Sequence, residues 1–425
     1  MAVVALGFMA GILPSASFVV AIPALLQGFR TDQAEGQLVM TVFMITNTIA
    51  MLPTPWLLRH VGMRNCFLGT MMLLVLTSIL GALSPSFAFL VAVRAAQGAG
   101  AGTLMPMSSI VIMRLFQPGQ RGRAAGIIGL VVTLGPALAP TIGGLMVDHW
   151  GWRSVSLLPL PLCLIAFIAA LRYLPAGTAA ERHSFDARGM LLLSLFTLAW
   201  LGALSNLHAA ARYWLLAFLV VLLGSVRAFV THARRHHTPL ISLQILKRAR
   251  VAMGAVLCFV LGFYSYGAAY LVPLYFQLTR HLSATRAGVA LMPGTLALAL
   301  SSPLAGFLVD SYSARQIMTI GMIVMAASWL ALGAFSEHCS YAEVVGIVVV
   351  SRVGFALVNT PLTQTVLRDL SSTAMGQAAA VLGYVRQLGG VFGVSALAVY
   401  VEWRAAGAGL GASALGRAYA EAFLI

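Results

Sequence analysis

Long apolar runs of about 20 residues follow one another along almost the whole chain, separated by short polar segments. A helix needs about 20 apolar residues to cross the hydrocarbon core of a bilayer, so this pattern predicts a series of membrane-spanning helices. We expect thirteen spans, and residues 419–425 resemble the start of a fourteenth that the chain does not complete. The sequence lacks the ten-residue alternation of apolar and polar positions that is typical of an outer-membrane barrel.

The predicted spans form two groups of unequal size around an insertion. They lie at 3–26, 37–58, 65–83, 87–113, 124–146, 154–171, 189–205, 213–230, 252–278, 288–309, 316–335, 341–366 and 376–401. We therefore expect an amino-terminal six-helix half over 1–174 and a carboxy-terminal half over 251–425. Between them, 175–250 holds a polar linker, two inserted helices and a basic cytoplasmic segment.

An internal repeat supports this division, because duplicated halves are typical of transporters. The pattern Pro23-x-x-x-Gln27 in the first span recurs as Pro273-x-x-x-Gln277 in the ninth. Arg94 in the fourth span has a weaker echo in Arg352. The sequence therefore predicts two halves of related structure.

Composition agrees with a membrane protein. The 425 residues are 60% hydrophobic and 9% charged, whereas soluble domains carry about 25% charged residues; the mean hydropathy is +0.93. The net charge of +15 comes mostly from arginines at helix ends and does not indicate nucleic-acid binding. More than half of the 26 Lys and Arg residues lie in the loops that are cytoplasmic if the amino terminus is inside, and this bias favours that orientation.

Two stretches carry the most informative polar and small residues. The first is Leu90-x-x-x-Arg94-x-x-Gln97-Gly98-x-Gly100, and an arginine inside a span usually faces protein or a watery cavity. The second runs from Gly135-Pro136 through Pro140 to Gly143-Gly144. Its glycines allow close helix packing, and its prolines interrupt the helical hydrogen bonds.

These stretches resemble motifs B and C of the major facilitator superfamily, and Trp152-Arg153 with Pro159-x-Pro161 resembles its fourteen-helix drug:proton antiporter branch (EmrB/QacA type). The resemblance implies an all-α membrane protein with the major facilitator fold, two six-helix halves and two inserted helices. It also implies a transporter of the bacterial inner membrane that exports small lipophilic or amphipathic compounds in exchange for protons. Relatives of this kind work with a periplasmic adaptor and an outer-membrane channel.

The chain departs from the family pattern at acidic positions. Pro14 stands in the first span where relatives commonly carry an acid. The loop that resembles motif A has Arg59 in place of the family's aspartate, so it lacks the acid of the family's latch. A second copy of motif A keeps both the glycine and the acid. The motif A residues of the two copies are Arg59, Gly62, Arg64, Gly306, Asp310 and Arg315.

Several further residues are candidates for the transport pathway. Those that could line a cavity are Asn47, Tyr266, Tyr270 and Arg386, although packing inside a helix interface explains the aromatic residues equally well. A proton-driven antiporter needs a group that changes its protonation state, usually a buried carboxylate. No predicted span has an acid near its middle, so the candidate proton carriers are the boundary acids Asp32, Glu35 and Glu343. Protons carried by a titrating substrate are the alternative.

Other classes of protein fit the sequence less well. The 11 acids lie in loops or near span ends, and no His, Cys and acid cluster with metal spacing is recognisable, so we expect neither an enzyme, a metal site nor a cofactor. No filter segment indicates a channel. The alternatives to proton-coupled efflux are a facilitator, a dedicated metabolite exporter and a degenerate protein that does not transport. In each case the partners are the lipid bilayer and a small molecule.

Overall fold

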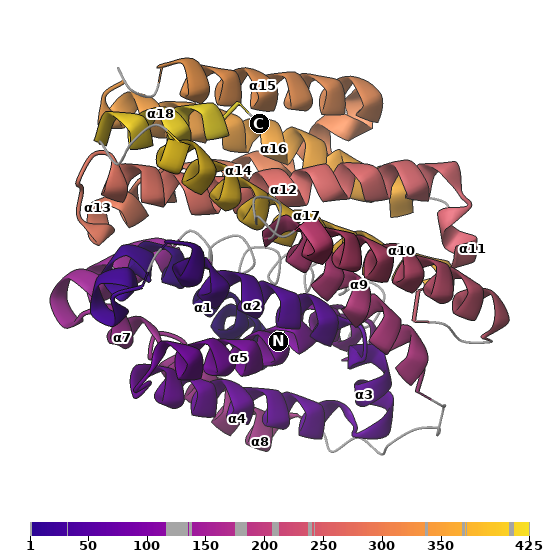
Figure 1. The fold of residues 1–425 in the computed structure, drawn as a ribbon. Helices are drawn as coiled ribbons and strands as arrows, with labels where there is room; N and C mark the ends of the chain where they lie inside the picture. The colour runs from indigo at the N-terminus through magenta and orange to yellow at the C-terminus, as the bar shows by residue number, and fades with distance from the viewer. Residues whose placement is uncertain are drawn as a thin grey trace. The chain divides into compact units, whose positions relative to one another are not determined.

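The computed structural model is helical throughout the residues that it describes (Figure 1), which are 2–31, 33–115, 135, 138–174, 185–205, 212–236, 240–241, 243–335, 339–367, 370, 372–407 and 412–424. Among them, ten helices are long and apolar enough to cross a membrane. Two shorter apolar helices, Leu38–Met51 and Ala187–Trp200, coincide with the predicted second and seventh spans. The predicted span at 124–146 lies mostly outside the described residues, and its last part belongs to a helix over 138–150.

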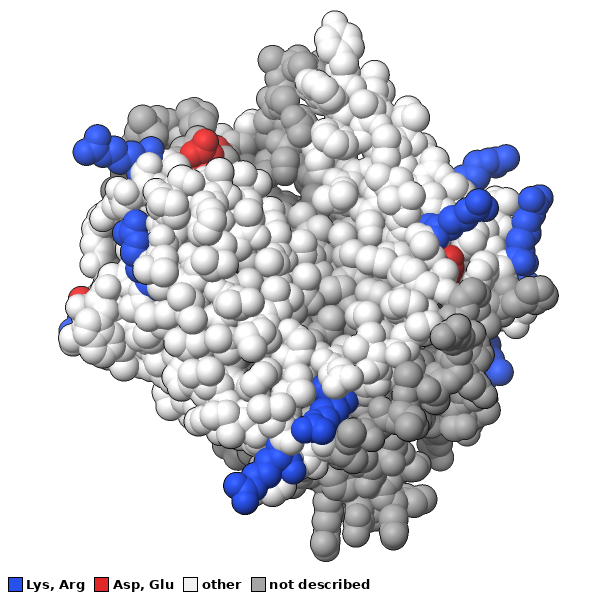
Figure 2. Space-filling view, turned by 90° about the horizontal axis from the view of Figure 1, so that it is seen from below, with Lys and Arg blue, Asp and Glu red and all other residues white. Residues whose placement is uncertain are grey.

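Exposed apolar side chains cover the long helices. Val220, Leu300 and Phe307 have exposed fractions of 70%, 79% and 70%. In Figure 2 the Lys and Arg side chains stand as separate groups among uncharged residues. A surface of this kind is suited to hydrocarbon and would be costly in water.

The chain divides into two compact units. The first unit comprises Met1–Ala139 and Met146–Leu240. Its helices are α1 (Ala2–Phe29), α2 (Gln33–Met51), α3 (Thr54–His60), α4 (Met63–Ala82), α5 (Phe87–Leu115), α7 (Trp152–Val155), α8 (Leu160–Tyr173), α9 (Ala187–Ser205) and α10 (Arg212–Arg235). The inserted helices α9 and α10 pack against each other within this unit.

The core of the first unit forms where α1, α4 and α8 meet. Phe8 of α1 and Phe67 and Met71 of α4 are almost completely buried. The facing side of α8 carries small residues, including Cys163 and Ala166, which are fully buried. Small residues let neighbouring helices approach closely, and close packing is a main source of helix association in a membrane.

Prolines divide two of the predicted spans. The span expected over 37–58 is wrong in its last part, because α2 ends at Met51 and the separate helix α3 begins at Thr54. Pro53 lies at this break, and a proline restricts the preceding residue and lacks the backbone donor that would continue the helix. The span expected over 154–171 lies within the apolar stretch Trp152–Tyr173, which consists of α7 and α8 joined by a turn that ends at Pro159.

The second unit comprises Pro140–Leu145 and Ile241–Ile425. Its helices are α11 (Leu243–Leu246), α12 (Ala249–Leu278), α13 (Ala284–Val289), α14 (Met292–Ser311), α15 (Ala314–Phe335), α16 (Tyr341–Leu367), α17 (Ser372–Gly407) and α18 (Ala412–Ala422). In Figure 1, α12 and α17 cross, and they form the most extensive helix pair of the unit. The predicted tenth span, 288–309, is interrupted after α13, just before Pro293.

The first long helix of each unit, α1 in one and α12 in the other, ends in the same way, which supports the internal repeat. Arg30 follows α1 with φ 56°, and His281 follows α12 with φ 52°. These are the two non-glycine residues with positive φ in the described part of the chain. Their separation in the sequence is close to that of Pro23 and Pro273. In both α1 and α12, therefore, a proline inside the helix is followed at nearly the same distance by a residue with positive φ.

Candidate functional site

Arg94 joins three helices in the centre of the first unit. It lies in the second turn of α5 and is 1% exposed. Its guanidinium group donates to Oε1 of Gln97 at 2.6 Å, to the carbonyl of Pro14 in α1 at 3.2 Å and to the carbonyl of Val39 in α2 at 3.3 Å. The arginine is therefore bound by both neighbouring helices, and Gln97 orients it from within its own helix.

The groups that contact the Arg94 guanidinium in the described part of the chain are uncharged. The rings of Phe18 and Phe43 lie 4.2 Å and 4.3 Å from its central carbon, a distance at which cation–π attraction operates. At Pro14, where relatives commonly carry an acid, the backbone carbonyl now accepts the hydrogen bond. A buried charge held only by neutral groups lacks the full compensation that a carboxylate would provide.

On the carboxy-terminal side of Arg94, two glycines of α5 allow close contact with the backbone of α2. Gly98 and Gly102 follow Arg94 at four-residue intervals, so the three share one face of the helix. A Cβ atom built on Gly98 would lie 2.2 Å from the carbonyl oxygen of Phe43, and one on Gly102 would lie 2.1 Å from that of Asn47. Asn47 thus contributes a backbone contact to this interface, and the contact leaves no room for a side chain on α5.

Gly100 differs from the other two glycines of its series. It points toward α4, and the nearest atoms to a Cβ built there are side-chain atoms of Leu74 and Leu73, at 3.2 Å and 3.4 Å. Leucine side chains can adjust to an added methyl group, whereas a helix backbone cannot do so without moving. The close-packing role expected of the series therefore rests on Gly98 and Gly102.

Arg352 is the counterpart of Arg94 in the second unit. It lies in α16, is 7% exposed and donates to Oγ of Ser265 in α12 at 3.3 Å. Its guanidinium carbon is 5.8 Å from the centre of the Tyr264 ring. Tyr264 and Ser265 stand about 250 residues after Pro14 and the next residue, Ser15, which is the spacing of the Pro23 and Pro273 helices. Arg94 therefore ties α5 to α1, and Arg352 ties α16 to α12, at positions that correspond in the internal repeat.

The stretch Arg386-Gln387-Leu-Gly389-Gly390 forms the contact between α17 and α12. A Cβ atom built on Gly389 would lie 2.0 Å from the carbonyl oxygen of Phe259, and one on Gly390 would lie 2.4 Å from the Tyr266 ring. The Tyr266 hydroxyl donates to Oε1 of Gln387. Tyr266 is accordingly a residue of this interface.

Arg386 lies partly buried at the same interface. Its Nη2 donates to Sγ of Cys258 at 3.6 Å, and its Nε is buried and has no hydrogen-bond partner among the described residues. Tyr270, about one turn of α12 beyond Tyr266, is 1% exposed and packed in the core of the unit. The packing explanation that the sequence left open for the tyrosines has direct support in these contacts.

The glycines of the stretch that resembles motif C are buried, and the stretch reaches a close backbone contact at Gly144. Gly135 and Gly144 are buried, as are Pro140 and Gly143, while Pro136 lies outside the described residues. A Cβ atom on Gly144 would lie 2.4 Å from the carbonyl oxygen of Ala284. Reciprocally, one on Gly288 would lie 2.2 Å from that of Pro140. Pro140–Leu145 and α13 are thus in close backbone contact within the second unit.

The motif A residues have separate roles. Gly62 has φ 82° and ψ 153°, a conformation that glycine adopts readily, and it starts α4. Nη2 of Arg64 donates to the carbonyl of Leu171 at 2.6 Å, so Arg64 stabilises the end of α8. In the second copy, Gly306 faces α16 and Arg315 is exposed at the start of α15. The side chains of Arg59 and Asp310 lie outside the described residues.

Of the candidate proton carriers, the two that the structure describes stand at the beginnings of helices. Asp32 lies outside the described residues, and Glu35 is exposed in the first turn of α2. Glu343 accepts from the backbone nitrogen and the hydroxyl of Ser340 at 2.7 Å and 2.8 Å, and the Ser340 hydroxyl in turn accepts from the Glu343 nitrogen. This reciprocal arrangement is a capping box, so Glu343 has a structural role at the start of α16.

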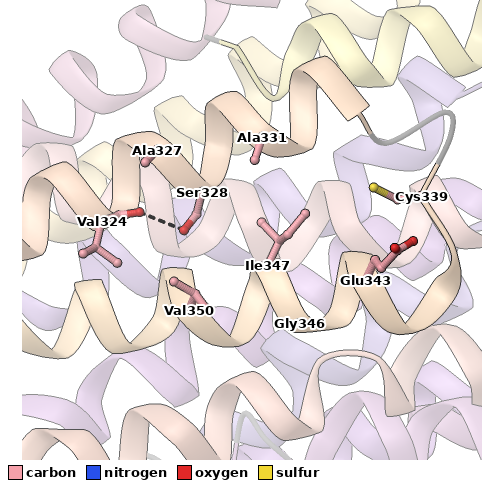
Figure 3. Close-up of a pocket in the computed structure, with 9 residues that line it drawn as sticks. All are labelled: Val324, Ala327, Ser328, Ala331, Cys339, Glu343, Gly346, Ile347 and Val350. Carbon is pink, nitrogen blue, oxygen red and sulfur yellow. Dashed lines mark hydrogen bonds between the residues drawn. The ribbon is translucent and has the colours of Figure 1, made fainter.

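An open pocket of about 620 Å³ lies between α15 and α16 (Figure 3). Its lining is mainly apolar, with Val324 and Ala331 from α15 and Ile347 and Val350 from α16. Glu343 stands at one end of the pocket and is held there by its capping box. This apolar lining suits a hydrocarbon chain better than a charged group.

A polar cluster that the sequence analysis missed ties the inserted helices together. Oδ1 of Asp186 accepts from the backbone nitrogen of Gly189 at 2.8 Å and lies 2.6 Å from Nε2 of His232. Oδ2 accepts from the nitrogen of Leu240 at 3.2 Å. Burial alone would raise the pKa of Asp186, but these hydrogen bonds together hold it below its ordinary value. Asp186 therefore fixes the start of α9, the end of α10 and the chain that follows.

The same cluster has the composition of a metal site. Ligand atoms of Asp186, His232 and His236 lie within 4.8 Å of one another. The four-residue spacing of His232 and His236, which puts both rings on one helix face, is the signal that sequence reasoning could have used. The oxygen atoms of Asp186 already accept three hydrogen bonds, which a bound metal ion would have to replace in part.

The helical architecture and the buried arginines are those of a secondary transporter built from two repeated units. The sequence profile described as Major Facilitator Superfamily matches residues 4–394. The chain therefore belongs to the Major Facilitator Superfamily, a family of transporters and not of enzymes. This confirms the fold class that the resemblance implied.

Relatives of similar sequence are transporters from bacteria. The chain is 27% identical to the MFS-type transporter YcnB of Bacillus subtilis, over 95% of this chain and 86% of that protein. It is 28% identical to a multidrug resistance protein B homolog of Mycobacterium tuberculosis, over 88% and 71%. It is 24% identical to the riboflavin transporter RibZ of Clostridioides difficile, over 92% and 86%.

Solved structures agree on the fold. The structure of a D-xylose–proton symporter matches with a TM-score of 0.69, covering 99% of this chain and 95% of that chain at 15% identity. A peptide transporter of the POT family matches with a TM-score of 0.68 at 18% identity. At these identities the likeness concerns the major facilitator fold alone.

Proposed function

We propose that this secondary transporter exports small lipophilic or amphipathic compounds from the bacterial cytoplasm, in exchange for protons, by alternating access. The observation that carries the proposal is the Arg94 junction. It sits in the stretch that resembles motif B and binds α1, α2 and α5 into one body. Halves held together in this way can rock as bodies around a central site. Relatives named as multidrug resistance proteins support efflux as the direction.

The coupling mechanism follows from the acids that the spans lack. Arginine stays protonated in proteins, so Arg94 cannot carry protons. Glu343 is occupied in a capping box, which leaves Asp32, Glu35 or a titrating substrate as better routes. In this proposal the amino terminus is cytoplasmic, and a periplasmic adaptor and outer-membrane channel receive the exported compound.

A second candidate is a facilitator or an exporter of one metabolite. The relative named as a riboflavin transporter favours it, because that protein is matched over most of its length. A degenerate protein without transport is the third possibility, and it predicts no difference between cells with and without the chain. Efflux of several unrelated dyes would favour the multidrug proposal over both.

The decisive experiment measures dye efflux from cells that express matched amounts of wild type, Arg94→Ala and Arg94→Lys. We expect loss of efflux in the alanine variant while the protein still reaches the membrane. Lysine should not fully restore efflux, because it lacks the planar fork that reaches three acceptors. Normal efflux by Arg94→Ala would contradict the proposed role of the junction.

Coupling is tested in liposomes with an imposed pH gradient and a fluorescent lipophilic substrate. We expect gradient-driven accumulation to fall when Asp32, Glu35 and Glu343 are all changed to the amides. Strong accumulation by that triple variant would refute these carriers. Transport that ignores the gradient would favour the facilitator.

A further inference from the structure

Two arginines in the second unit are held only by neutral groups. Nη1 of Arg352 donates to the Ser265 hydroxyl at 3.3 Å, and Nη2 of Arg386 donates to the Cys258 sulfur at 3.6 Å. A buried charge normally requires an opposite charge together with hydrogen bonds to all its donors. A guanidinium group has five N–H donors, and among the described residues each of these two arginines makes one hydrogen bond.

In the described parts of α12, α14, α15, α16 and α17, no acid lies close enough along its helix to compensate these charges. α12 and α15 carry no Asp or Glu. On α16, Glu343 precedes Arg352 by nine residues, which is about 13 Å along the axis. On α17, Glu402 follows Arg386 by sixteen residues, or about 24 Å. On α14, Gly294 faces Arg352. Asp310 follows Gly294 by sixteen residues, or about 24 Å along the axis.

Arg352 of α16 and Arg386 of α17 both contact one face of α12, which is called the stripe below. Cys258 and Ser265 are seven residues apart, so they share a helix face and are separated by about 10 Å along the axis. Of the two guanidinium groups, that of Arg386 is less buried and retains an unpartnered Nε. Positive charge therefore lies at two points along this face of α12, and that of Arg386 is the less buried of the two.

Uncharged aromatic groups flank this stripe. The Tyr264 hydroxyl is hydrogen bonded to Ser351, and its ring already lies beside the Arg352 guanidinium. The Tyr266 hydroxyl donates to Gln387. Both rings are packed against neighbouring helices, and the guanidinium groups beside them repel a cation. A planar oxyanion fits the fork of an arginine better than any other common ionic group.

We propose that the cluster formed by α12, α16 and α17 binds the anionic group of the transported compound, a carboxylate or sulfonate on an aromatic or other apolar body. Arg386 binds the oxyanion through its free donors, and Arg352 adds positive charge further along α12. The inference rests on the proposed export function and narrows it. The chain then selects organic anions and zwitterions over the lipophilic cations that an acid-lined site would attract.

The test measures binding of two matched probes to the purified full-length chain in phosphatidylcholine nanodiscs, with empty nanodiscs subtracted. The probes are 4-(1-pyrenyl)butanoate and its trimethylammonium analogue, which share the apolar body and differ in charge. We expect the wild type to bind the anion about tenfold more tightly than the cation, roughly 1.4 kcal/mol. Equal affinities, or a preference for the cation, would overturn the proposal.

Variants assign the effect to the cluster. Arg386→Gln and Arg352→Gln should each lower affinity for the anion about tenfold and leave that for the cation unchanged or higher. Arg417→Gln, which removes a charge from an exposed position of α18, is the control and should change neither. Equal loss in all three variants would show that only net charge matters and would refute the site. If one variant does not fold, the other variant and the wild-type preference still decide.

Transport separates this inference from the proposed function. The same probes are loaded into proteoliposomes, and their release is followed with and without a pH gradient. Anion binding without transport would refute export and leave the anion site standing. Gradient-driven transport of the cation, without specific binding of the anion, would refute the anion site and leave export standing.

Discussion

The contact between Gly102 and the backbone of α2 gives a sharp prediction about packing. In Gly102→Ala the new Cβ would lie 2.1 Å from the carbonyl oxygen of Asn47, whereas ordinary contacts of this kind begin near 3.4 Å. The atom that it meets is backbone, so α2 and α5 must separate by about 1 Å for the methyl group to fit. Overpacking of this kind costs about 1–3 kcal/mol.

Gly100→Ala is the matched control. It adds the same methyl group to the same helix, two residues away, but meets the side chains of Leu74 and Leu73 at 3.2 Å and 3.4 Å. Both substitutions remove a flexible glycine from a helix, which by itself favours the helix by about 1 kcal/mol. The difference between the two variants therefore isolates the clash with α2.

Thermal unfolding in detergent, followed by the labelling of buried cysteines with a thiol-reactive fluorophore, measures the difference. Cys163 and Cys258 are 0% and 1% exposed, so their labelling reports unfolding of the first and second unit. We expect Gly102→Ala to lower the midpoint reported by Cys163 by several degrees, while Gly100→Ala leaves it unchanged or slightly higher. Equal midpoints for the two variants would refute the packing argument.

Three further predictions concern loops and helix ends. Asp186→Ala should destabilise the protein by about 2 kcal/mol at pH 7, because it removes the acceptor of three hydrogen bonds. Since those bonds lower the pKa of Asp186, its contribution should be complete above about pH 4 and vanish in stronger acid, so variant and wild-type thermal midpoints should converge there. Glu343→Gln keeps an acceptor for Ser340 and should preserve the thermal midpoint, whereas Glu343→Ala should lower it. Equal thermal midpoints for these two variants would exclude the capping role. Reporter fusions at Lys247 and Ser340 should report cytoplasm and outside, and a periplasmic signal at Lys247 would contradict the two-helix insertion.

Much of the helical architecture could be predicted from apolar run length, because spanning a bilayer imposes a minimum length on every helix. The breaks at Pro53 and Pro159 escaped that reasoning. Hydropathy remains high across them, and the decisive factor is the local loss of a backbone donor and not polarity. Both prolines are visible in the sequence, so a reading that weighed them against hydropathy would have divided these spans.

The partners of the site residues were harder to predict. The sequence identified Arg94 by its unusual position in an apolar run, but its acceptors at Pro14 and Val39 lie 80 and 55 residues away and are backbone atoms. Backbone acceptors leave no mark on residue type. The Asp186 cluster was missed for a related reason, since its members are 46 residues apart and only folding brings them together.

The repeated placement of Arg94 and Arg352 constrains how this transporter can respond to protons. Arg94 ties α5 to α1 and Arg352 ties α16 to α12, at positions that correspond in the internal repeat. Where an arginine is held by a carboxylate, protonation of the acid releases it, and the release can drive a change of conformation. Here the acceptors are carbonyls, an amide and a hydroxyl, none of which gains a proton in the physiological range. In the proton-coupled export that we propose, protons therefore act elsewhere in the chain or arrive with the substrate, and an anionic substrate would also supply the missing negative charge.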